Sequence, residues 1–328
     1  MLERCQIHSA LPPLAHLIIC APLCDPGRHP ITASAAHRTA GDHIARGIAF
    51  ALIAFSIFSC ADAGVKWLTM RYSVFQIIFV SNLFTLIPVA LLIRHEGGLH
   101  KLRPRHPKLV GLRSILLAID MVLVFYAFVE LPLADAYALI FAVPMVVTAL
   151  SVPILGEKVG WRRWSAVVVG FIGVLIVLRP GIAELKAGHI AAISSALFFG
   201  LSLILVRRMG KDESAGGLIF WMVVALLAVS APVMPRVYVP MSWPDLGLMA
   251  VLGLLSGAGH LMLIRAFRLA PSAIVAPFHY SQMIWAVFFG LFLFGDIPDA
   301  WVISGSTVII GSGLYILWRE TVRGRAKA

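Results

Sequence analysis

The sequence predicts an all-α membrane protein: ten transmembrane helices in two inverted five-helix repeats, with the N- and C-termini in the cytoplasm. Three observations predict this fold class: an apolar composition in long runs, a biased distribution of Lys and Arg, and an internal repeat. The chain of 328 residues is 60% hydrophobic and only 13% charged, whereas a soluble domain has roughly 25% charged residues. Most of the protein surface is therefore expected to contact lipid.

Each apolar run is long enough to cross a bilayer as a helix, since about 20 helical residues span the roughly 30 Å of hydrocarbon. The runs are continuous and do not alternate, which excludes the strands of a membrane barrel. The predicted helices cover about residues 46–66, 73–93, 109–129, 133–155, 163–179, 187–206, 216–234, 246–266, 272–294 and 300–318.

Lys and Arg concentrate in alternate loops, which sets the orientation because cytoplasmic loops carry the excess. Seventeen lie within 94–108, 158–163, 207–211, 265–268 and 319–327, against five within 66–71, 179–186 and at Arg236. Both termini are then cytoplasmic. The formal net charge of +11 is a topology signal, and no nucleic-acid partner is predicted because no basic face lies on a soluble element.

Residues 1–45 precede the predicted helices and form an N-terminal extension. Their apolar stretch is broken by three prolines and is too short to span a membrane. We expect a disordered extension or a start codon placed too early, with a signal peptide as the alternative. The four cysteines form no C-x-x-C pair, so no disulfide framework, metal site or cofactor is predicted.

One motif, A-F-x-x-x-P-x-A, occurs twice, at 127–134 and at 266–273, with an offset of 139. Flanking residues match in the same order at offsets of 139 to 141: Gly156-Glu157 with Gly295-Asp296, Trp161 with Trp301, Gly47 with Gly188, Phe58 with Phe199, and Lys66 with Arg207. The chain therefore has repeats at 46–180 and 187–318 and a basic cytoplasmic tail at 319–328. Because five is odd, the repeats are inverted, a plan of secondary transporters with sites near the midplane.

The ten helices, the repeat, and the segments "LGEKVGWRRW" and "FGDIPDAW" resemble the drug/metabolite transporter superfamily, EamA-like group. This resemblance implies a central cavity lined by the first four helices of each repeat, with the fifth and tenth helices peripheral. It also implies a multi-pass protein of the bacterial inner membrane that takes up a small polar metabolite. A vitamin or nucleoside-like compound, such as riboflavin or S-adenosylmethionine, is the expected substrate, with export of amino acids or drugs as the alternative.

An integral membrane enzyme is the alternative from another class. The chain contains no H-E-x-x-H, no G-x-S-x-G and no phosphate-binding loop. No catalytic residues are therefore predicted, and the chain is not expected to be an enzyme. The partners expected are a small-molecule substrate, the lipid bilayer and a proton as coupling ion, while the oligomeric state stays open.

Asp120 lies near the middle of the third predicted helix. A charged side chain is costly in lipid and usually faces the protein interior. It is a candidate for substrate binding and for proton coupling, and a carboxyl hydrogen-bonded to a neighbouring helix is the equal alternative. Asp62 and Lys66 are one turn apart, a spacing that allows an ion pair; the favoured alternative is that Lys66 complements the helix dipole.

Two helices place polar and aromatic residues where they could contact a flat ring. The fourth helix presents Tyr137 and Phe141 on one face with Pro144 and Thr148, and the alternative is a packing stripe with a kink. The ninth offers His279, Tyr280, Gln282 and Trp285, with packing or lipid contact as the alternative. His279 is also a coupling candidate, because histidine titrates near neutrality.

Asn82 and His260 complete the candidate substrate-binding residues. Asn82 is central in the second helix, where an interhelical hydrogen bond is the alternative. His260 follows Gly253 and Gly257, whose spacing permits close helix packing. Glu157 and Asp296 each precede the last helix of a repeat, where we expect them to cap free backbone donors.

Overall fold

The computed structural model describes residues 31–157, 159–182, 184–209, 213–270 and 272–325. Contacts divide the chain into two units, residues 1–41 and residues 42–328, and the second is described here by itself. Helix α1 comprises Ile31–Thr69. The predicted extension thus enters α1 from Ile31 on, and its remainder, with Cys5, Cys20 and Cys24, lies outside the described residues.

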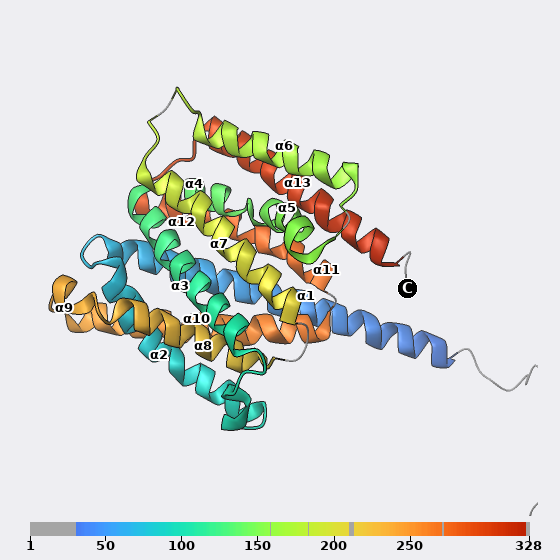
Figure 1. Ribbon diagram of the computed structural model, residues 1–328, viewed down its shortest axis with the longest axis horizontal. Coiled ribbons are helices and arrows are strands. Elements are labelled where there is room, and N and C mark those ends of the chain that lie inside the picture. The colour runs from blue at the N-terminus through green and yellow to red at the C-terminus, as the bar shows by residue number, and fades with distance from the viewer. Residues whose placement is uncertain (1–30, 158, 183, 210–212, 271, 326–328) are drawn as a thin grey trace, which may run out of the picture. The chain divides into compact units, whose positions relative to one another are not determined.

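The described residues are almost entirely helical, as predicted (Figure 1). The elements after α1 follow in the order α2 (Val74–His95), η1 (Leu99–Leu102), α3 (Pro107–Glu130), α4 (Leu133–Ile140), α5 (Val143–Leu155), α6 (Trp161–Leu178), α7 (Ala187–Met209), α8 (Ala215–Ser230), α9 (Met234–Val237), α10 (Trp243–Leu269), α11 (Ser272–Val275), η2 (Ala276–Tyr280), α12 (Ser281–Phe289), η3 (Gly290–Phe294) and α13 (Ala300–Arg325). Helix α13 includes much of the predicted basic tail.

Nine helical stretches in the described residues are long and apolar enough to cross a membrane. They correspond to nine of the ten predicted helices, and two of them combine several elements, 133–155 and 276–294. The remaining predicted helix is α8, which is apolar but only 16 residues long. At 1.5 Å per residue it covers about 24 Å, less than the roughly 30 Å of hydrocarbon.

Glycines let helices of different repeats approach closely. Gly47 of α1 lies against Ala266 and Ala270 at the end of α10, and a Cβ there would clash with them. Gly188 of α7 lies in the same way against Glu130 and Leu131 at the end of α3. The two contacts correspond at the repeat offset, so the first helix of each repeat packs against the third helix of the other.

The predicted close packing at Gly253 and Gly257 is confirmed. Gly253 of α10 meets the carbonyl oxygen of Ser81 in α2, and Gly257 meets the ring of Pro88. Any side chain at either position would push α10 away from α2. A buried hydrogen bond of 3.0 Å from Thr85 Oγ1 to the Gly253 carbonyl oxygen also joins the helices.

Helices α6 and α13 pack along one another, antiparallel, as Figure 1 shows. Gly170 of α6 contacts Ser312 of α13, whereas Gly173 contacts Ile309. Positions that advance along α6 therefore meet positions that retreat along α13. As a result, the segments that lead into these two helices lie at opposite ends of the pair.

The fourth helix of each repeat is interrupted at equivalent positions. In the first repeat, α4 ends at Ile140 and α5 starts at Val143. In the second, the 3₁₀ segment η2 ends at Tyr280 and α12 starts at Ser281. Pro144 lies at the start of α5 and Pro277 at the start of η2, and proline cannot donate the helical hydrogen bond at its position.

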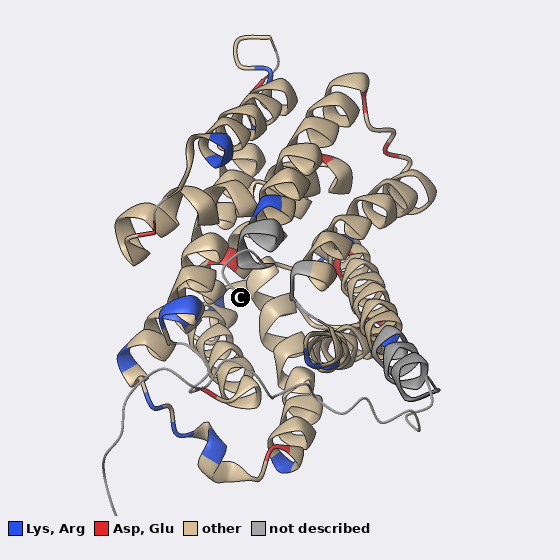
Figure 2. Ribbon diagram, turned by 90° about the vertical axis from the view of Figure 1, so that its right-hand side faces the viewer, with Lys and Arg blue, Asp and Glu red and all other residues tan. Residues whose placement is uncertain are grey.

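Charged residues are unevenly placed over the helix ends. Figure 2 shows Lys and Arg segments predominating over Asp and Glu on the end of the bundle that faces the viewer. Such an imbalance is typical of the cytoplasmic side of a membrane protein. The orientation of the chain stays a prediction.

Candidate functional site

A cavity of about 300 Å³ lies in the middle of the bundle. Its lining residues come from α1, α2, α3, α4, α7, α8, α10, η2 and α12, whereas α6 and α13 contribute none of them. This is the arrangement that the family resemblance implied. Six candidate residues line it: Asn82, Asp120, Tyr137, His260, His279 and Gln282.

A chain of hydrogen bonds crosses the cavity wall from one repeat to the other. The Tyr137 hydroxyl on α4 donates to the carboxylate of Asp62 on α1. Gln282 Nε2 on α12 donates to the same Tyr137 oxygen at 3.3 Å. Both Tyr137 and Gln282 are buried, so these bonds lie away from solvent and fix the two side chains against one another.

Asp62 is a cavity residue that sequence reasoning did not include. The spacing to Lys66 allowed an ion pair within α1, and the structure does not form it; Lys66 lies in the last turn of α1, as the favoured dipole alternative requires. Lys66 Nζ instead contacts Asp296 Oδ2 at 3.2 Å and donates to the Leu131 carbonyl oxygen at 2.8 Å. Asp62 faces Tyr137 and lines the cavity. The sequence feature that could have identified Asp62 is its carboxylate within an apolar predicted helix, as for Asp120.

Asp120 on α3 lines the same cavity. Its carboxyl makes no hydrogen bond or ion pair with any described residue. The alternative expected from the sequence, a carboxyl bonded to a neighbouring helix, is therefore not what the described part of the chain contains. An unpaired carboxyl group beside a cavity is available to a ligand.

His260 and His279 contact aromatic rings at the cavity. His260 Nδ1 donates to the Ser256 carbonyl oxygen at 2.8 Å, and its ring lies edge-on to Phe58 at 5.0 Å. His279 lies 5.1 Å from the ring of Phe55. Asn82 donates to the Ile78 carbonyl oxygen of its own helix at 2.9 Å.

Phe141 and Tyr280, which are equivalent in the two repeats, contact each other. Their ring centroids are 5.1 Å apart and their planes are nearly perpendicular. Both line a second cavity of about 220 Å³, to which His279 and Phe199 also contribute, as they do to the central one. The two repeats therefore contact each other here through equivalent residues.

Trp285 lies apart from the other residues of the ninth predicted helix. Its ring stacks on Phe289 at 5.7 Å and meets the edge of Phe288 at 5.9 Å. It lines neither the central nor the second cavity. The polar-aromatic cluster read from the sequence is therefore divided, with His279 and Gln282 at the central cavity and Trp285 in an aromatic group of its own.

Two ion pairs connect the repeats at equivalent positions. Lys66 pairs with Asp296 at 3.2 Å, and Arg207 pairs with Glu157 at 3.8 Å. The expectation that these acids cap the following helices is wrong. Helix α6 has no side-chain hydrogen bond at its N-cap, Gly160, and the Val302 amide in α13 donates to Asp299.

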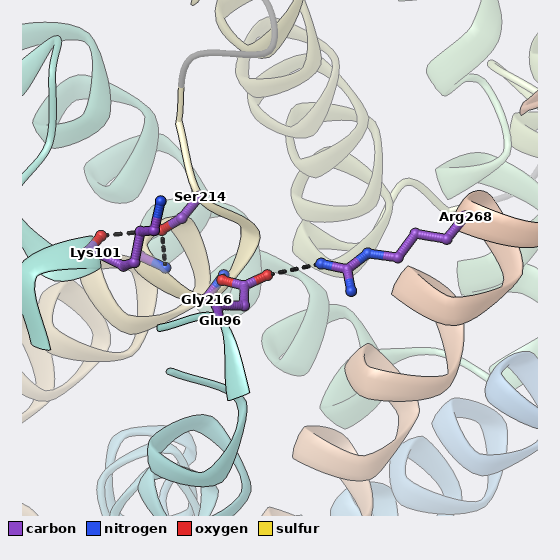
Figure 3. A network of polar contacts seen from close by, with 6 residues as sticks. Glu96, Lys101, Ser214, Gly216 and Arg268 are labelled. Carbon is purple, nitrogen blue, oxygen red and sulfur yellow. Dashed lines mark hydrogen bonds and ion pairs between the residues drawn. The ribbon is translucent and has the colours of Figure 1, made fainter. Parts of the chain in front are cut away.

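Another cavity, of about 830 Å³, lies at the helix ends, and none of the candidate residues is among its lining residues. Figure 3 shows how it is held together: Glu96 accepts from the Gly216 amide at 2.9 Å and from Arg268 at 3.0 Å. Ser214 donates to the Lys101 carbonyl oxygen at 2.9 Å. These bonds tie η1 and the ends of α2, α8 and α10 together.

A multi-pass bundle of apolar helices around a central polar and aromatic cavity defines a membrane transporter as the class of protein. The model of the EamA-like transporter family matches residues 45–179 and again residues 186–318. The chain belongs to this family. Among the described residues, no three His, Cys, Asp or Glu side chains gather into a possible metal site.

Several known proteins are similar to the chain over most of its length. An S-adenosylmethionine uptake transporter of Rickettsia prowazekii is 27% identical, over 84% of this chain and 93% of the relative. A pseudopaline exporter of Pseudomonas aeruginosa is 26% identical, over 82% and 95%. A riboflavin transporter of Rhizobium johnstonii is 25% identical, over 86% and 94%.

A solved crystal structure of a protein also matches. It superimposes with a TM-score of 0.56 and covers 83% of this chain and 95% of its own. At 15% sequence identity this likeness concerns the fold alone.

Proposed function

We propose that the chain is a secondary transporter that takes up a small polar metabolite across the bacterial inner membrane. A vitamin or nucleoside-like compound such as riboflavin is the expected substrate. The observation that carries the proposal is the central cavity, which combines hydrogen-bonding groups with aromatic rings between the two repeats. Its volume of about 300 Å³ is at the lower end of the range for ligand sites.

The lining residues suit a flat polar compound. Gln282 and His279 offer an amide and an imidazole for hydrogen bonds, and Phe55 and Phe58 offer ring faces beside them. Nucleobases and isoalloxazine rings carry donors and acceptors on their edges and apolar faces. In this proposal the polar groups orient the ring and the aromatic groups stack on it.

The proposed topology has ten transmembrane helices, with both termini cytoplasmic and the repeats at 46–180 and 187–318. The short helix α8 is the seventh of them in this proposal. Support comes from the equivalent contacts of Gly47 and Gly188, which relate the first and third helices of opposite repeats. Reporter fusions after Arg105 and after Lys211 are expected in the cytoplasm, and a fusion after Lys186 in the periplasm. A cytoplasmic reading after Lys186 would contradict the inversion.

Asp120 and His279 are the proposed coupling residues, with the proton as coupling ion. Each is ionisable and lines the central cavity, so a proton on either would be felt by a bound substrate. Asp120→Asn removes the charge and keeps the shape. Transport by this variant is expected to fall and to lose its pH dependence, and a pH profile identical to that of the unchanged protein would exclude Asp120 from coupling.

Export is the second candidate function. The similarity to an exporter at 26% identity, close to the 27% and 25% of the uptake and riboflavin transporters, favours considering it. Accumulation of labelled riboflavin and S-adenosylmethionine should be compared in intact cells with and without the chain. We expect faster accumulation with the chain, whereas slower accumulation from the same pool would establish export. Equal rates for all compounds would contradict a role in moving these metabolites.

A further inference from the structure

The central cavity contains two carboxyl groups but no Lys or Arg among its lining residues. Two carboxyls, Asp62 and Asp120, belong to its lining, and so do His260 and His279. No Lys or Arg is among the described residues that form this wall. The cavity therefore holds fixed groups that can become negative and no permanent positive charge to balance them.

The two cations nearest these carboxyls in the sequence, Lys66 and Arg113, do not line the cavity. Lys66, one turn after Asp62, is held by Asp296 and the Leu131 carbonyl oxygen. Arg113, two turns before Asp120 on α3, donates to the Leu218 carbonyl oxygen of α8 at 3.2 Å, and its Nε has no hydrogen-bond partner among the described residues. Asp62 has the Tyr137 hydroxyl as its partner, and Asp120 has none among the described residues.

A buried carboxylate without a cation is unfavourable, and a bound cation removes that cost. Aromatic faces add to the attraction, because their quadrupoles stabilise a cation within about 6 Å of the ring. The same cavity is lined by six aromatic side chains: Phe55, Phe58, Phe125, Phe128, Tyr137 and Phe199. Carboxylates combined with aromatic rings are the chemistry that recognises ammonium and sulfonium groups.

We propose that the cavity selects an organic cation, a metabolite that carries a fixed sulfonium or quaternary ammonium charge beside its polar ring. Asp120 is the counter-ion for this charge. Asp62, positioned by Tyr137, is the second acidic group. The inference rests on the proposed transport function and narrows its substrate class, because a neutral ring such as riboflavin leaves Asp120 unpaired in the cavity.

The test compares two compounds that differ in one methyl group and its charge: S-adenosylmethionine, a sulfonium, and S-adenosylhomocysteine, a neutral thioether. Binding to the purified chain in lipid nanodiscs is measured by calorimetry. The sulfonium is expected to bind about tenfold more tightly or better, the scale of a desolvated cation contact. Equal affinities would overturn the inference.

Variants assign the preference to a residue. Asp120→Asn should remove the preference, Asp120→Glu should retain much of it, and Asp62→Asn should reduce it. Asp299→Asn is the control, since it removes a carboxylate at the start of α13, outside the cavity lining. A preference that survives in Asp120→Asn would overturn the role of Asp120. Thermal unfolding and gel filtration confirm that each variant is folded.

Failure of this inference differs from failure of the transport function. If neither adenosyl compound binds at millimolar concentration, the cation class is wrong. Uptake of riboflavin into proteoliposomes containing the same protein would then leave the proposed transporter standing. Loss of both binding and uptake would overturn the two together.

Discussion

Two equivalent ion pairs join the repeats, and one pair is closer and more buried than the other. Lys66 and Asp296 are 3.2 Å apart with side chains 11% and 31% exposed, whereas Arg207 and Glu157 are 3.8 Å apart with 42% and 40% exposed. Lys66 also lies over the Phe294 ring, 5.0 Å from its centroid. Equivalent residues thus have unequal surroundings.

The two ion pairs lie at opposite ends of the antiparallel helices α6 and α13. Asp296 precedes α13 and Glu157 precedes α6, and these helices are antiparallel. The looser pair lies at the end where Arg207 lines the second cavity. A transporter built from inverted repeats exchanges the conformations of its repeats between two states. In the inverted topology proposed above, unequal pairs fit one state of such an exchange, because equal pairs would make both ends alike.

Lys66→Met gives the largest expected effect. It removes a partly buried cation and leaves Asp296 and the Leu131 carbonyl oxygen without it. Stripping one partner from a buried pair costs about 3–5 kcal/mol, and partial exposure here places the cost near the lower end. Arg207→Met, the matched change at the exposed pair, should cost less than about 1 kcal/mol.

Thermal unfolding of both variants in the same detergent measures this difference. Equal losses of stability would mean that the two ends are equivalent in solution, and the contrast between the pairs would then be lost. Asp296→Asn serves as the check on Lys66, because it removes the other charge of the pair and should also destabilise the protein. In the double variant the two losses should not add, since residues in contact are coupled.

Tyr137→Phe gives the next largest effect, at the interrupted helix of the first repeat. The hydroxyl donates to Asp62 and accepts from Gln282. Its removal leaves two buried polar groups without this partner, at about 1–3 kcal/mol. Transport should fall with stability, and unfolding midpoints together with uptake rates measure both. Unchanged values would show that the hydrogen-bond chain has no role.

Some of this comparison could be predicted from the sequence. Helical spans depend on runs of apolar residues, which are local. The offset of about 140 residues related Lys66 to Arg207 before any contact was known. The resemblance to a transporter family implied which helices surround the cavity. Six of the nine candidate residues line the central cavity, because polar groups in apolar spans face the interior.

The partners of these residues could not be predicted in the same way. Lys66 reaches across 230 positions to Asp296, and the i, i+4 spacing to Asp62 carried no information about that competitor. Trp285 follows a 3₁₀ segment at η2, where the turn is tighter than in an α-helix. Its ring contacts are with Phe288 and Phe289 at helical spacing, which corresponds to the packing alternative for this cluster.

The smallest expected effect belongs to Tyr280→Phe, at the interrupted helix of the second repeat. The Tyr280 hydroxyl is buried and has no hydrogen-bond partner among the described residues, and it lies against Gly313 of α13. Removing an unpaired buried hydroxyl costs no hydrogen bond and relieves its desolvation, so the stability should stay within about 0.5 kcal/mol or rise. The ring contact with Phe141 at 5.1 Å is kept.

Phe141→Ala is the contrast, since it deletes that fully buried ring and should cost about 3–5 kcal/mol. Thermal unfolding of the two variants beside Tyr137→Phe decides whether the hydroxyls of the two repeats differ. A Tyr280→Phe loss as large as that of Tyr137→Phe would mean that this hydroxyl has a partner in the membrane, and that the two interrupted helices use their tyrosines alike.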